Sequence, residues 1–379
     1  MQSRRVFLGV LVVCAAALNG WLLQTGDPRG ALAGMSFAAV CLGFSFFLPL
    51  MRNRAPVLVT SRAPRRPVSS ASADGTDRAR TVPIVNAFSI DLEDYFHTEV
   101  SSRDVDFEQW DRMPSRVECS VHRMLDLLEE QHVRATVFVL GWVAERYPHL
   151  IREVAERGHE IACHSYRHKR VDQLTPGLFR EDTRKAKQAI EDATGRRVEG
   201  YRAPSFSIVP GTEWAYEVLE ELEFLYDSSV HPVWHATYSN ARAPRFPYVV
   251  AGTGVLEIPI STWRAGGVNL PVGGGAYLRL LPYWYVQHGL QVVNCRERQP
   301  VTLYVHPWEI DYLQPPIQSG WASHARQLWG TRTMESKLRA LLASMPFAPI
   351  AEVYGARIAA SAPEAAVDAE PVPLFARVS

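Results

Sequence analysis

The sequence has no excess of charge of either sign. Its 379 residues include 40 lysines and arginines and 40 aspartates and glutamates, so the formal net charge is zero. A domain that binds nucleic acid usually carries a basic excess on the surface that makes the contact. We therefore predict no nucleic-acid partner for this chain.

Cysteine is scarce as well. The five cysteines (Cys14, Cys41, Cys119, Cys163 and Cys295) stand far apart, and no two of them have the CxxC spacing of a metal or redox site. An odd number without paired spacing gives no disulfide framework. No internal repeat is visible either. What the chain does have is a hydrophobic content of 47%, which is enough for a sizeable core.

Two long uncharged runs stand near the N-terminus. Val6–Leu23 contains 18 residues and Ala31–Leu50 contains 20, and neither includes a charged side chain. Each run is about long enough to cross the hydrocarbon core of a bilayer as a helix. We predict that residues 1–50 form a membrane anchor of two transmembrane helices, with a turn at Gly26 and Pro28. A single span and a cleaved signal peptide are the alternatives.

Arginines flank both ends of this predicted hairpin. They are Arg4 and Arg5 before it, and Arg52, Arg54, Arg62, Arg65 and Arg66 after it. The positive-inside rule then predicts that the downstream domain lies in the cytoplasm, and a single span would move it to the other side. Residues 51–82 are rich in arginine, proline, serine and alanine, which is typical of a basic flexible linker.

From Val82 onwards, short apolar runs alternate with amphipathic stretches. We predict strands at Val82–Ile90, Ala135–Leu140, Glu160–Cys163 and from Gly200, and helices at Val117–His132, Tyr147–Arg157, Thr175–Thr194 and Thr212–Leu222. This alternation indicates an α/β domain with parallel strands, which we place at residues 83–350. Such domains gather their functional residues at the carboxyl ends of the strands.

Two parts of the chain do not follow this alternation. Residues 244–282 include Gly266, Gly267 and the triplet Gly273–Gly275, and we predict an irregular, loop-rich insertion there. Residues 351–379 are rich in alanine, proline and valine, and we predict a disordered C-terminal tail.

Three acids follow the first predicted strand. Asp91, Glu93 and Asp94 lie within four residues, in SIDLEDYF. Carboxylates this close repel each other unless positive charge lies between them. A divalent metal would supply that charge, and a neighbouring acid could then act as a general base. The alternative is a solvated acidic turn or the start of a helix.

His164 and His168 stand four residues apart in GHEIACHSYRH. Two histidines with this spacing can meet on one face of a helical turn and bind one metal. The alternative is an ordinary surface pair.

Three further side chains follow predicted strands. Arg202, in YRAPSF, is suited to a paired hydrogen bond with a carboxylate, or else to a structural salt bridge. His306, in TLYVHPWE, is suited to a general acid, or else is a buried structural histidine. Asp227, in YDSSV, could orient such a histidine.

The order of these motifs resembles the NodB-like polysaccharide deacetylases, which are carbohydrate esterase family 4. The resemblance covers about residues 83–350. It is closer to the subgroup associated with exosortase and exopolysaccharide loci, in the stretches FSIDLEDYFH, FVLGWVAERYP, GHEIACHSYRH, GGGAYLRLLPYWY and YVHPWEID. The resemblance implies a distorted (β/α) barrel of the NodB type.

It also implies an activity and its partners. The chain would be a metal-dependent hydrolase that removes N-acetyl groups from sugars of an exopolysaccharide or of its lipid-linked precursor. Its partners would be acetylated polysaccharide or lipid-linked oligosaccharide, the bacterial inner membrane, and exopolysaccharide-assembly proteins. The alternatives are a cyclic-amide or peptidoglycan-directed hydrolase of the same fold, and an inactive membrane-tethered sugar-binding protein.

The resemblance assigns the metal site and the base. Asp91 would activate water held by the metal, which His164, His168 and an acid would bind. Leu92 separates acids that are adjacent in the family's common motif, so the acid ligand is either Glu93 or Asp94. Zn²⁺ is the expected ion, with Co²⁺, Mn²⁺ or Ni²⁺ as alternatives.

The remaining roles are carried over in the same way. Arg202 would pair with Asp91, Asp227 would pair with His306, and His306 would protonate the leaving amine. The backbone N–H of Ser205 would bind the oxyanion. Ser205 itself stands where tyrosine is common in the family. Val230 and Tyr304 replace a common tryptophan and leucine, so the acetyl pocket is expected to differ in shape.

Overall fold

The computed structural model describes residues 83–99, 101–235, 240–317 and 327–361. All of them belong to one compact unit that begins at Pro83. The predicted anchor (residues 1–50) and linker (residues 51–82) lie outside the described residues. Among the residues that are described, no helix is both long enough and apolar enough to cross a membrane.

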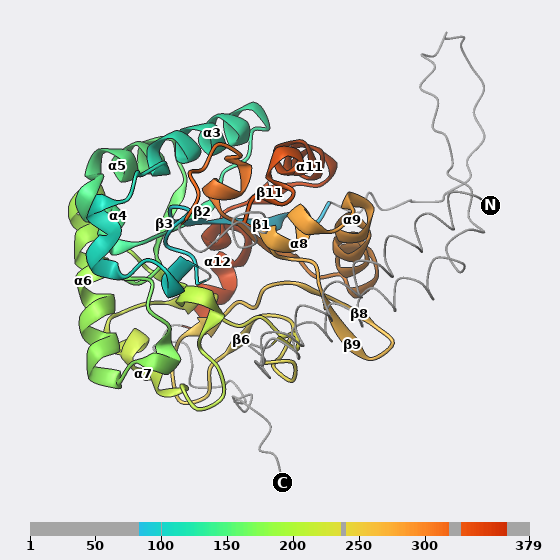
Figure 1. Ribbon diagram of the computed structural model, residues 1–379. Coiled ribbons are helices and arrows are strands. Elements are labelled where there is room, and N and C mark those ends of the chain that lie inside the picture. The colour runs from blue at the N-terminus through green and yellow to red at the C-terminus, as the bar shows by residue number, and fades with distance from the viewer. Residues whose placement is uncertain (1–82, 100, 236–239, 318–326, 362–379) are drawn as a thin grey trace, which may run out of the picture. The chain divides into compact units, whose positions relative to one another are not determined.

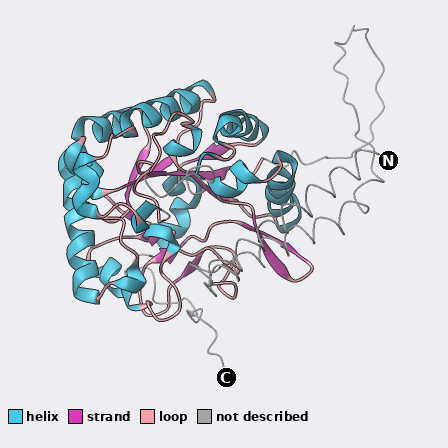
Figure 2. Cartoon of the chain, viewed as in Figure 1, coloured by secondary structure: helices cyan, strands magenta, loops and turns pink. Residues whose placement is uncertain are grey.

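A mostly parallel sheet forms the centre of the domain (Figures 1 and 2). Its strands run in the order β10-β1-β2-β3-β4-β5-β7-β6, with β11 beside β1, and only β6 pairs in the antiparallel sense. The strands are β1 (Asn86–Leu92), β2 (Thr136–Val139), β3 (Glu160–Cys163), β4 (Gly200–Tyr201), β5 (Tyr226–Asp227), β6 (Tyr248–Val249), β7 (Leu256–Glu257), β10 (Thr302–Val305) and β11 (Phe347–Ala348). Two further strands, β8 (Thr262–Ala265) and β9 (Val268–Pro271), form a separate antiparallel pair.

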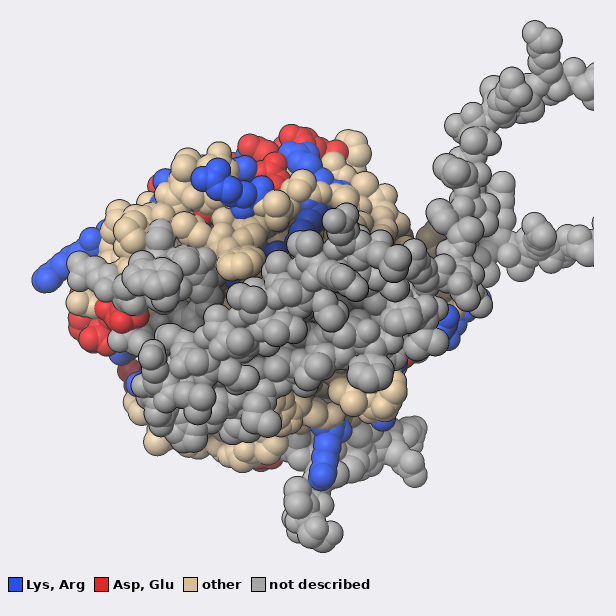
Figure 3. All heavy atoms as spheres, turned by 45° about the vertical axis from the view of Figure 1, so that its right-hand side comes forward, with Lys and Arg blue, Asp and Glu red and all other residues tan. Residues whose placement is uncertain are grey.

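Helices lie between most of the parallel strands. They are α3 (Val117–Glu130), α4 (Gly141–Arg146), α5 (Pro148–Glu156), α6 (Pro176–Thr194), α7 (Trp214–Glu221), α8 (Gly275–Leu280), α9 (Tyr283–Val292), α11 (Thr331–Ser344) and α12 (Ile350–Ser361). Figure 1 shows α3 to α6 along one outer side of the strands, and α8, α9 and α11 grouped on another. The visible part of the surface in Figure 3 carries basic and acidic side chains interspersed, in keeping with the balanced composition.

The architecture is an α/β half-barrel, which agrees in part with the predicted distorted (β/α) barrel. Within the described residues, the terminal strands β10 and β6 do not pair with each other, so the sheet stays open. The parallel α/β arrangement itself is confirmed.

The local patterns that predicted individual elements are also confirmed. Every residue of β1 is buried, as predicted for a buried strand within a parallel sheet. In α3 the periodic positions Val121, Met124, Leu125 and Leu128 all face the core. Helix α6 begins at the N-cap Thr175 and ends at Gly195, whose φ of 65° is the left-handed conformation that glycine adopts readily.

Two predicted boundaries differ from the structure. The stretch 244–282 is not simply loop, because it supplies β7 to the central sheet as well as β8, β9 and the start of α8. The domain also continues beyond residue 350. Helix α12 occupies the first part of the predicted tail and buries Tyr354 and Ile358 against Ala87 and Phe138. Residues 362–379 lie outside the described residues.

Candidate active site

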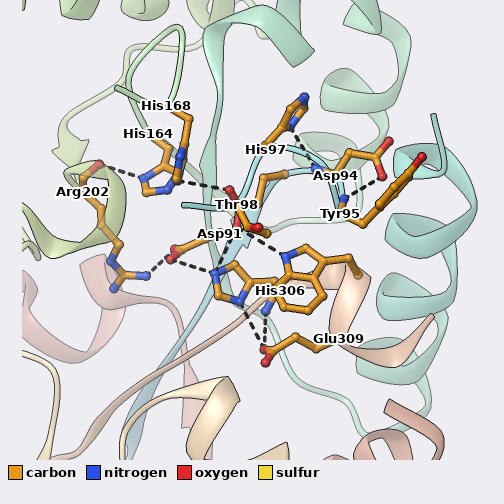
Figure 4. A network of polar contacts seen from close by, with 12 residues as sticks. Asp91, Asp94, Tyr95, His97, Thr98, His164, His168, Arg202, His306 and Glu309 are labelled. Carbon is orange, nitrogen blue, oxygen red and sulfur yellow. Dashed lines mark hydrogen bonds and ion pairs between the residues drawn. The ribbon is translucent and has the colours of Figure 1, made fainter. Parts of the chain in front are cut away.

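The carboxyl ends of neighbouring strands bring the predicted polar residues together (Figure 4). Strand β1 carries Asp91 and leads into Glu93, and β3 leads into His164. Strand β4 leads into Arg202, and β10 leads into His306. Parallel strands end at one edge of the sheet, so residues distant in the sequence meet there.

Glu93, His164 and His168 form a group that could bind a metal. One ligand atom from each lies within 4.8 Å of the others. His164 Nδ1 lies 2.8 Å from the carbonyl of Arg202, so this nitrogen carries the proton and Nε2 keeps its lone pair. Burial lowers the pKa of His164 to about 4 and that of His168 well below its ordinary value. Both imidazoles are therefore neutral, as metal ligands must be.

The carboxylate of Glu93 also fits a cation. Its Oε2 lies 3.2 Å from His168 Nε2, yet this oxygen makes no hydrogen bond. Burial raises the pKa of Glu93 to about 7 because the ionised group lacks enough compensating positive charge. A divalent ion among these three side chains would supply that charge.

The two histidines are not on a helix, contrary to the predicted helical turn. They lie in the loop after β3, where Ser165 and His168 adopt left-handed φ angles of 64° and 51°. The hydroxyl of Ser165 accepts a hydrogen bond from the backbone N–H of His168 at 3.1 Å. This tight loop, rather than a helical period, brings the two rings to 5.3 Å.

Asp94 does not join the metal group. Its Oδ2 accepts hydrogen bonds from the Ser115 hydroxyl (2.8 Å) and from the backbone N–H groups of Arg116 (2.7 Å) and Val117 (3.1 Å). Asp94 thus satisfies donors at the start of α3, where helix N–H groups lack partners. Of the two acids left open by the sequence, only Glu93 lies with the histidines.

Asp91 and Arg202 pair as expected. Arg202 is fully buried, and its Nη1 donates to Asp91 Oδ1 at 2.5 Å and to Ser89 Oγ at 2.9 Å. Its other nitrogens donate to the carbonyl and hydroxyl of Ser228, each at 3.0 Å. Burial alone would raise the pKa of Asp91, but Arg202, His164 and His306 together bring it below the ordinary value. Asp91 is therefore ionised at neutral pH.

His306 faces both acids. Its Nε2 lies 3.2 Å from Glu93 Oε1 and 3.9 Å from Asp91 Oδ2. Burial lowers the pKa of His306, but the hydrogen bond that His306 donates to Glu309 and the charges of Glu93, Glu309 and Asp91 raise it to about 9. The ring of Trp308 stacks on His306 at a centroid distance of 5.2 Å.

The predicted pairing of Asp227 with His306 is wrong. Asp227 Oδ1 accepts a hydrogen bond from Ser229 Oγ at 2.6 Å, and the carboxyl group shares a hydrogen bond with Glu257 of β7. The acid beside His306 is Glu309, whose Oε2 lies 3.2 Å from His306 Nδ1. Sequence reasoning missed Glu309, although it lies three residues after the histidine in HPWE, within reach of one helical turn.

Ser205 lies in a strained turn directly after Arg202. Ser205 and Phe206 have φ angles of 54° and 52°, an uncommon conformation for residues other than glycine. Such strain clusters at functional sites. The proposed oxyanion role of the Ser205 backbone stays a prediction.

The two replaced pocket positions are buried. Val230 is 1% exposed. The ring of Tyr304 lies 5.5 Å from that of His306 and 4.7 Å from that of Phe206. Tyr304 therefore forms part of the wall beside His306, at the position where the resemblance implies leucine.

Two family models match the chain. The model described as Polysaccharide deacetylase matches residues 107–221. The model described as Domain of unknown function (DUF3473) matches residues 228–355. His164, His168 and Arg202 lie in the first segment, and His306 and Glu309 lie in the second.

Curated relatives also match part of the chain. A peptidoglycan-N-acetylglucosamine deacetylase from Bacillus cereus is 29% identical over 96 residues, which are 25% of this chain and 35% of the relative. A peptidoglycan deacetylase from Helicobacter pylori is 29% identical over 113 residues, 30% of this chain and 38% of the relative. The chain thus spans about a third of the length of such relatives.

A solved structure shares the fold. A Mycobacterium smegmatis protein assigned as a polysaccharide deacetylase matches with a TM-score of 0.51 and 20% identity, over 82% of this chain and 99% of that one. None of these matches tests the likeness to the exosortase-associated subgroup, which stays a prediction. The family model thus makes residues 107–221 similar to polysaccharide deacetylases, the curated relatives carry the names of deacetylases, and the solved structure shares the fold.

Proposed function

We propose that this chain is a metal-dependent N-deacetylase that acts on sugars of an exopolysaccharide or of its lipid-linked precursor. One observation carries the proposal. A buried group of Glu93, His164 and His168, with ligand atoms within 4.8 Å, lies beside the Asp91–Arg202 pair and His306. That arrangement joins a cation site, a base and an acid in one place.

The donor set suits a divalent transition metal. Two imidazole nitrogens and one carboxylate are typical ligands of Zn²⁺, and Co²⁺, Mn²⁺ or Ni²⁺ can use the same set. A bound ion would polarise the amide carbonyl and lower the pKa of water.

The protein's own groups would then move the protons. Ionised Asp91, held by Arg202, accepts a proton from the attacking water as its oxygen bonds to the acyl carbon. The carbon–nitrogen bond breaks next, and protonated His306 gives the Nε2 proton to the leaving amine. The products are acetate and a free amino sugar. The backbone N–H of Ser205 is our candidate for stabilising the oxyanion.

The first experiment measures acetate release from N-acetylglucosamine oligomers by the full-length protein. We expect release that stops with a chelator, returns with added Zn²⁺, and is absent in Asp91→Asn and His164→Ala. Activity that persists in metal-free protein, or in both variants, would contradict the proposal.

A peptidoglycan-directed activity is the second candidate. The names of the Bacillus cereus and Helicobacter pylori relatives favour it. Acetate release from purified peptidoglycan and from acetylated exopolysaccharide, compared at equal acetyl content, separates the two. A preference of tenfold or more for peptidoglycan would replace our substrate assignment.

We further propose that the chain is anchored in the bacterial inner membrane with its catalytic domain in the cytoplasm. The two uncharged runs and their flanking arginines support this placement. A domain there would meet lipid-linked precursors and exopolysaccharide-assembly proteins. Alkaline phosphatase fused after Arg66 should be inactive, and an active fusion would put the domain on the periplasmic side.

A further inference from the structure

Glu309 is fully buried, and both of its carboxylate oxygens accept hydrogen bonds. Oε2 accepts from the backbone N–H of His306 at 3.1 Å and lies 3.2 Å from His306 Nδ1. Oε1 accepts from Arg279 Nε at 3.3 Å. Figure 4 shows the carboxylate on the side of the imidazole opposite Asp91.

This arrangement requires a carboxylate. Arg279, the His306 backbone and protonated Nδ1 are all donors, so each oxygen of residue 309 has to accept. An amide has only one accepting oxygen, and its NH₂ group would face a donor. The carboxylate therefore keeps the proton of His306 on Nδ1 and directs Nε2 towards Asp91 and Glu93.

Helix α8 is shaped around the same carboxylate. A Cβ atom at Gly275, the first residue of α8, would lie 1.9 Å from Glu309 Oε2. Glycine at this position thus leaves room for Glu309. Arg279 is four residues further along, so it lies on the same face of the helix. Its Nη1 also donates to the carbonyls of Gln327 and Trp329, which ties the guanidinium to the chain before α11.

We propose that Glu309 is the positioning residue for His306, and that Gly275 and Arg279 of α8 hold Glu309 in place. The segment matched by the family of unknown function, residues 228–355, contains all four of these residues: Gly275, Arg279, His306 and Glu309. That segment would then supply the general acid, His306, and the residues that position it. The inference rests on the proposed deacetylase function.

The role of Glu309 follows from proton balance. His306 enters the step with protons on both nitrogens and gives the one on Nε2 to the amine as the carbon–nitrogen bond breaks. The Nδ1 proton stays on His306, against Glu309. Glu309 exchanges no proton with the substrate and acts only through the orientation and charge of the ring.

The test compares two leaving groups. An amide needs a proton on its leaving nitrogen, whereas 4-nitrophenyl acetate releases a phenolate that needs none. For Glu309→Gln we expect kcat on N-acetylglucosamine oligomers to fall on the order of 10²-fold with KM little changed. The rate on 4-nitrophenyl acetate should fall less than about threefold. Gly275→Ala should reproduce this selective loss, because its methyl group displaces the carboxylate.

Glu297→Gln is the matched control. Glu297 forms an ion pair with Arg245 at 2.9 Å in the same matched segment, and it makes no contact with His306 that would position the ring. The substitution therefore also takes the carboxylate partner away from an arginine. We expect it to leave both rates unchanged. Equal losses on both substrates in Glu309→Gln, or no loss on either, would overturn the positioning role.

A second readout does not depend on turnover. In ¹⁵N spectra of histidine-labelled protein, with His306 assigned by a His306→Gln variant, Nδ1 of His306 should carry a proton in the wild type. A neutral imidazole of His306 in the wild type, with its single proton on Nε2, would overturn the proposal, even if the variants fail to fold. If the wild type releases no acetate from any N-acetylated sugar, the deacetylase function fails, while this spectrum still tests the Glu309–His306 pair.

Discussion

Replacement of Arg202 by methionine should destabilise the protein strongly. Methionine fills much of the same space but leaves Asp91, 2% exposed, without its cation. Removing one partner of a buried ion pair costs about 3–5 kcal/mol. Four hydrogen bonds to Asp91, Ser89 and Ser228 are lost as well. Because a domain has about 5–15 kcal/mol of stability in total, we expect the variant to fold marginally.

The loss should also depend on pH. In the wild type, the pKa of Asp91 in the folded state lies below its ordinary value of 3.8. This carboxylate therefore contributes stability that is present above about pH 4 and is lost as the pH falls through the folded pKa. Without Arg202, burial dominates and raises the pKa, so the variant loses stability as the pH rises. The difference between the two proteins should grow from pH 5 to pH 8.

Urea unfolding of the full-length protein at both pH values measures this difference. Arg134→Met is the control, because the Arg134–Glu352 ion pair is more than half exposed on both sides. We expect the control to change the unfolding free energy by less than about 0.5 kcal/mol. A loss below about 1 kcal/mol in Arg202→Met, or an equal loss at pH 5 and pH 8, would refute the reasoning.

Three more predictions concern the metal group and His306. In metal-free protein, the raised pKa of His306 stabilises the folded state. This stabilisation is complete below pH 6.5 and is lost as the pH rises through about 9. The melting temperature should therefore fall over that range in the wild type and fall less in His306→Gln. Zn²⁺ at 100 times its Kd should add about 2.7 kcal/mol to the unfolding free energy, and thermal shift assays should show no such gain in His164→Ala. Glu93→Gln should abolish Zn²⁺ binding in calorimetry, whereas Asp94→Asn should keep it and lose about 1 kcal/mol of stability through the start of α3. Zn²⁺ binding lost in Asp94→Asn but kept in Glu93→Gln would reverse our choice of ligand.

The parallel strands and the helices between them could be predicted from the sequence because each is encoded locally. The apolar run before Asp91 and the 3.6-residue period of α3 need no knowledge of the rest of the chain. The gathering of Asp91, His164, Arg202 and His306 followed from one general rule, that parallel strands end at the same edge. The same rule does not say whether β10 and β6 meet, so the open half-barrel was not predicted.

The choice between Glu93 and Asp94 lay beyond local reasoning. Both acids follow β1, and both are buried. The choice depends on where α3 begins, more than twenty residues later, because its first N–H groups bind Asp94. Only the acid without such donors keeps an unpaired oxygen for a cation, and that acid is Glu93.

The acid that contacts His306 in the structure, Glu309, differs from the predicted partner, Asp227. Asp227 occupies the expected position at the end of β5, but Glu257 of the neighbouring strand β7 lies opposite it in register, and the two carboxyl groups interact. Two buried carboxyl groups in contact cannot both ionise, so Asp227 is a poor partner for a protonated histidine. Glu309 is instead surrounded by donors, and its pKa is lowered, against the effect of burial, by His306 and Arg279. In the structure, Gly275 leaves room for Glu309 and Arg279 donates to it, so residues of α8 surround the ionised acid beside His306.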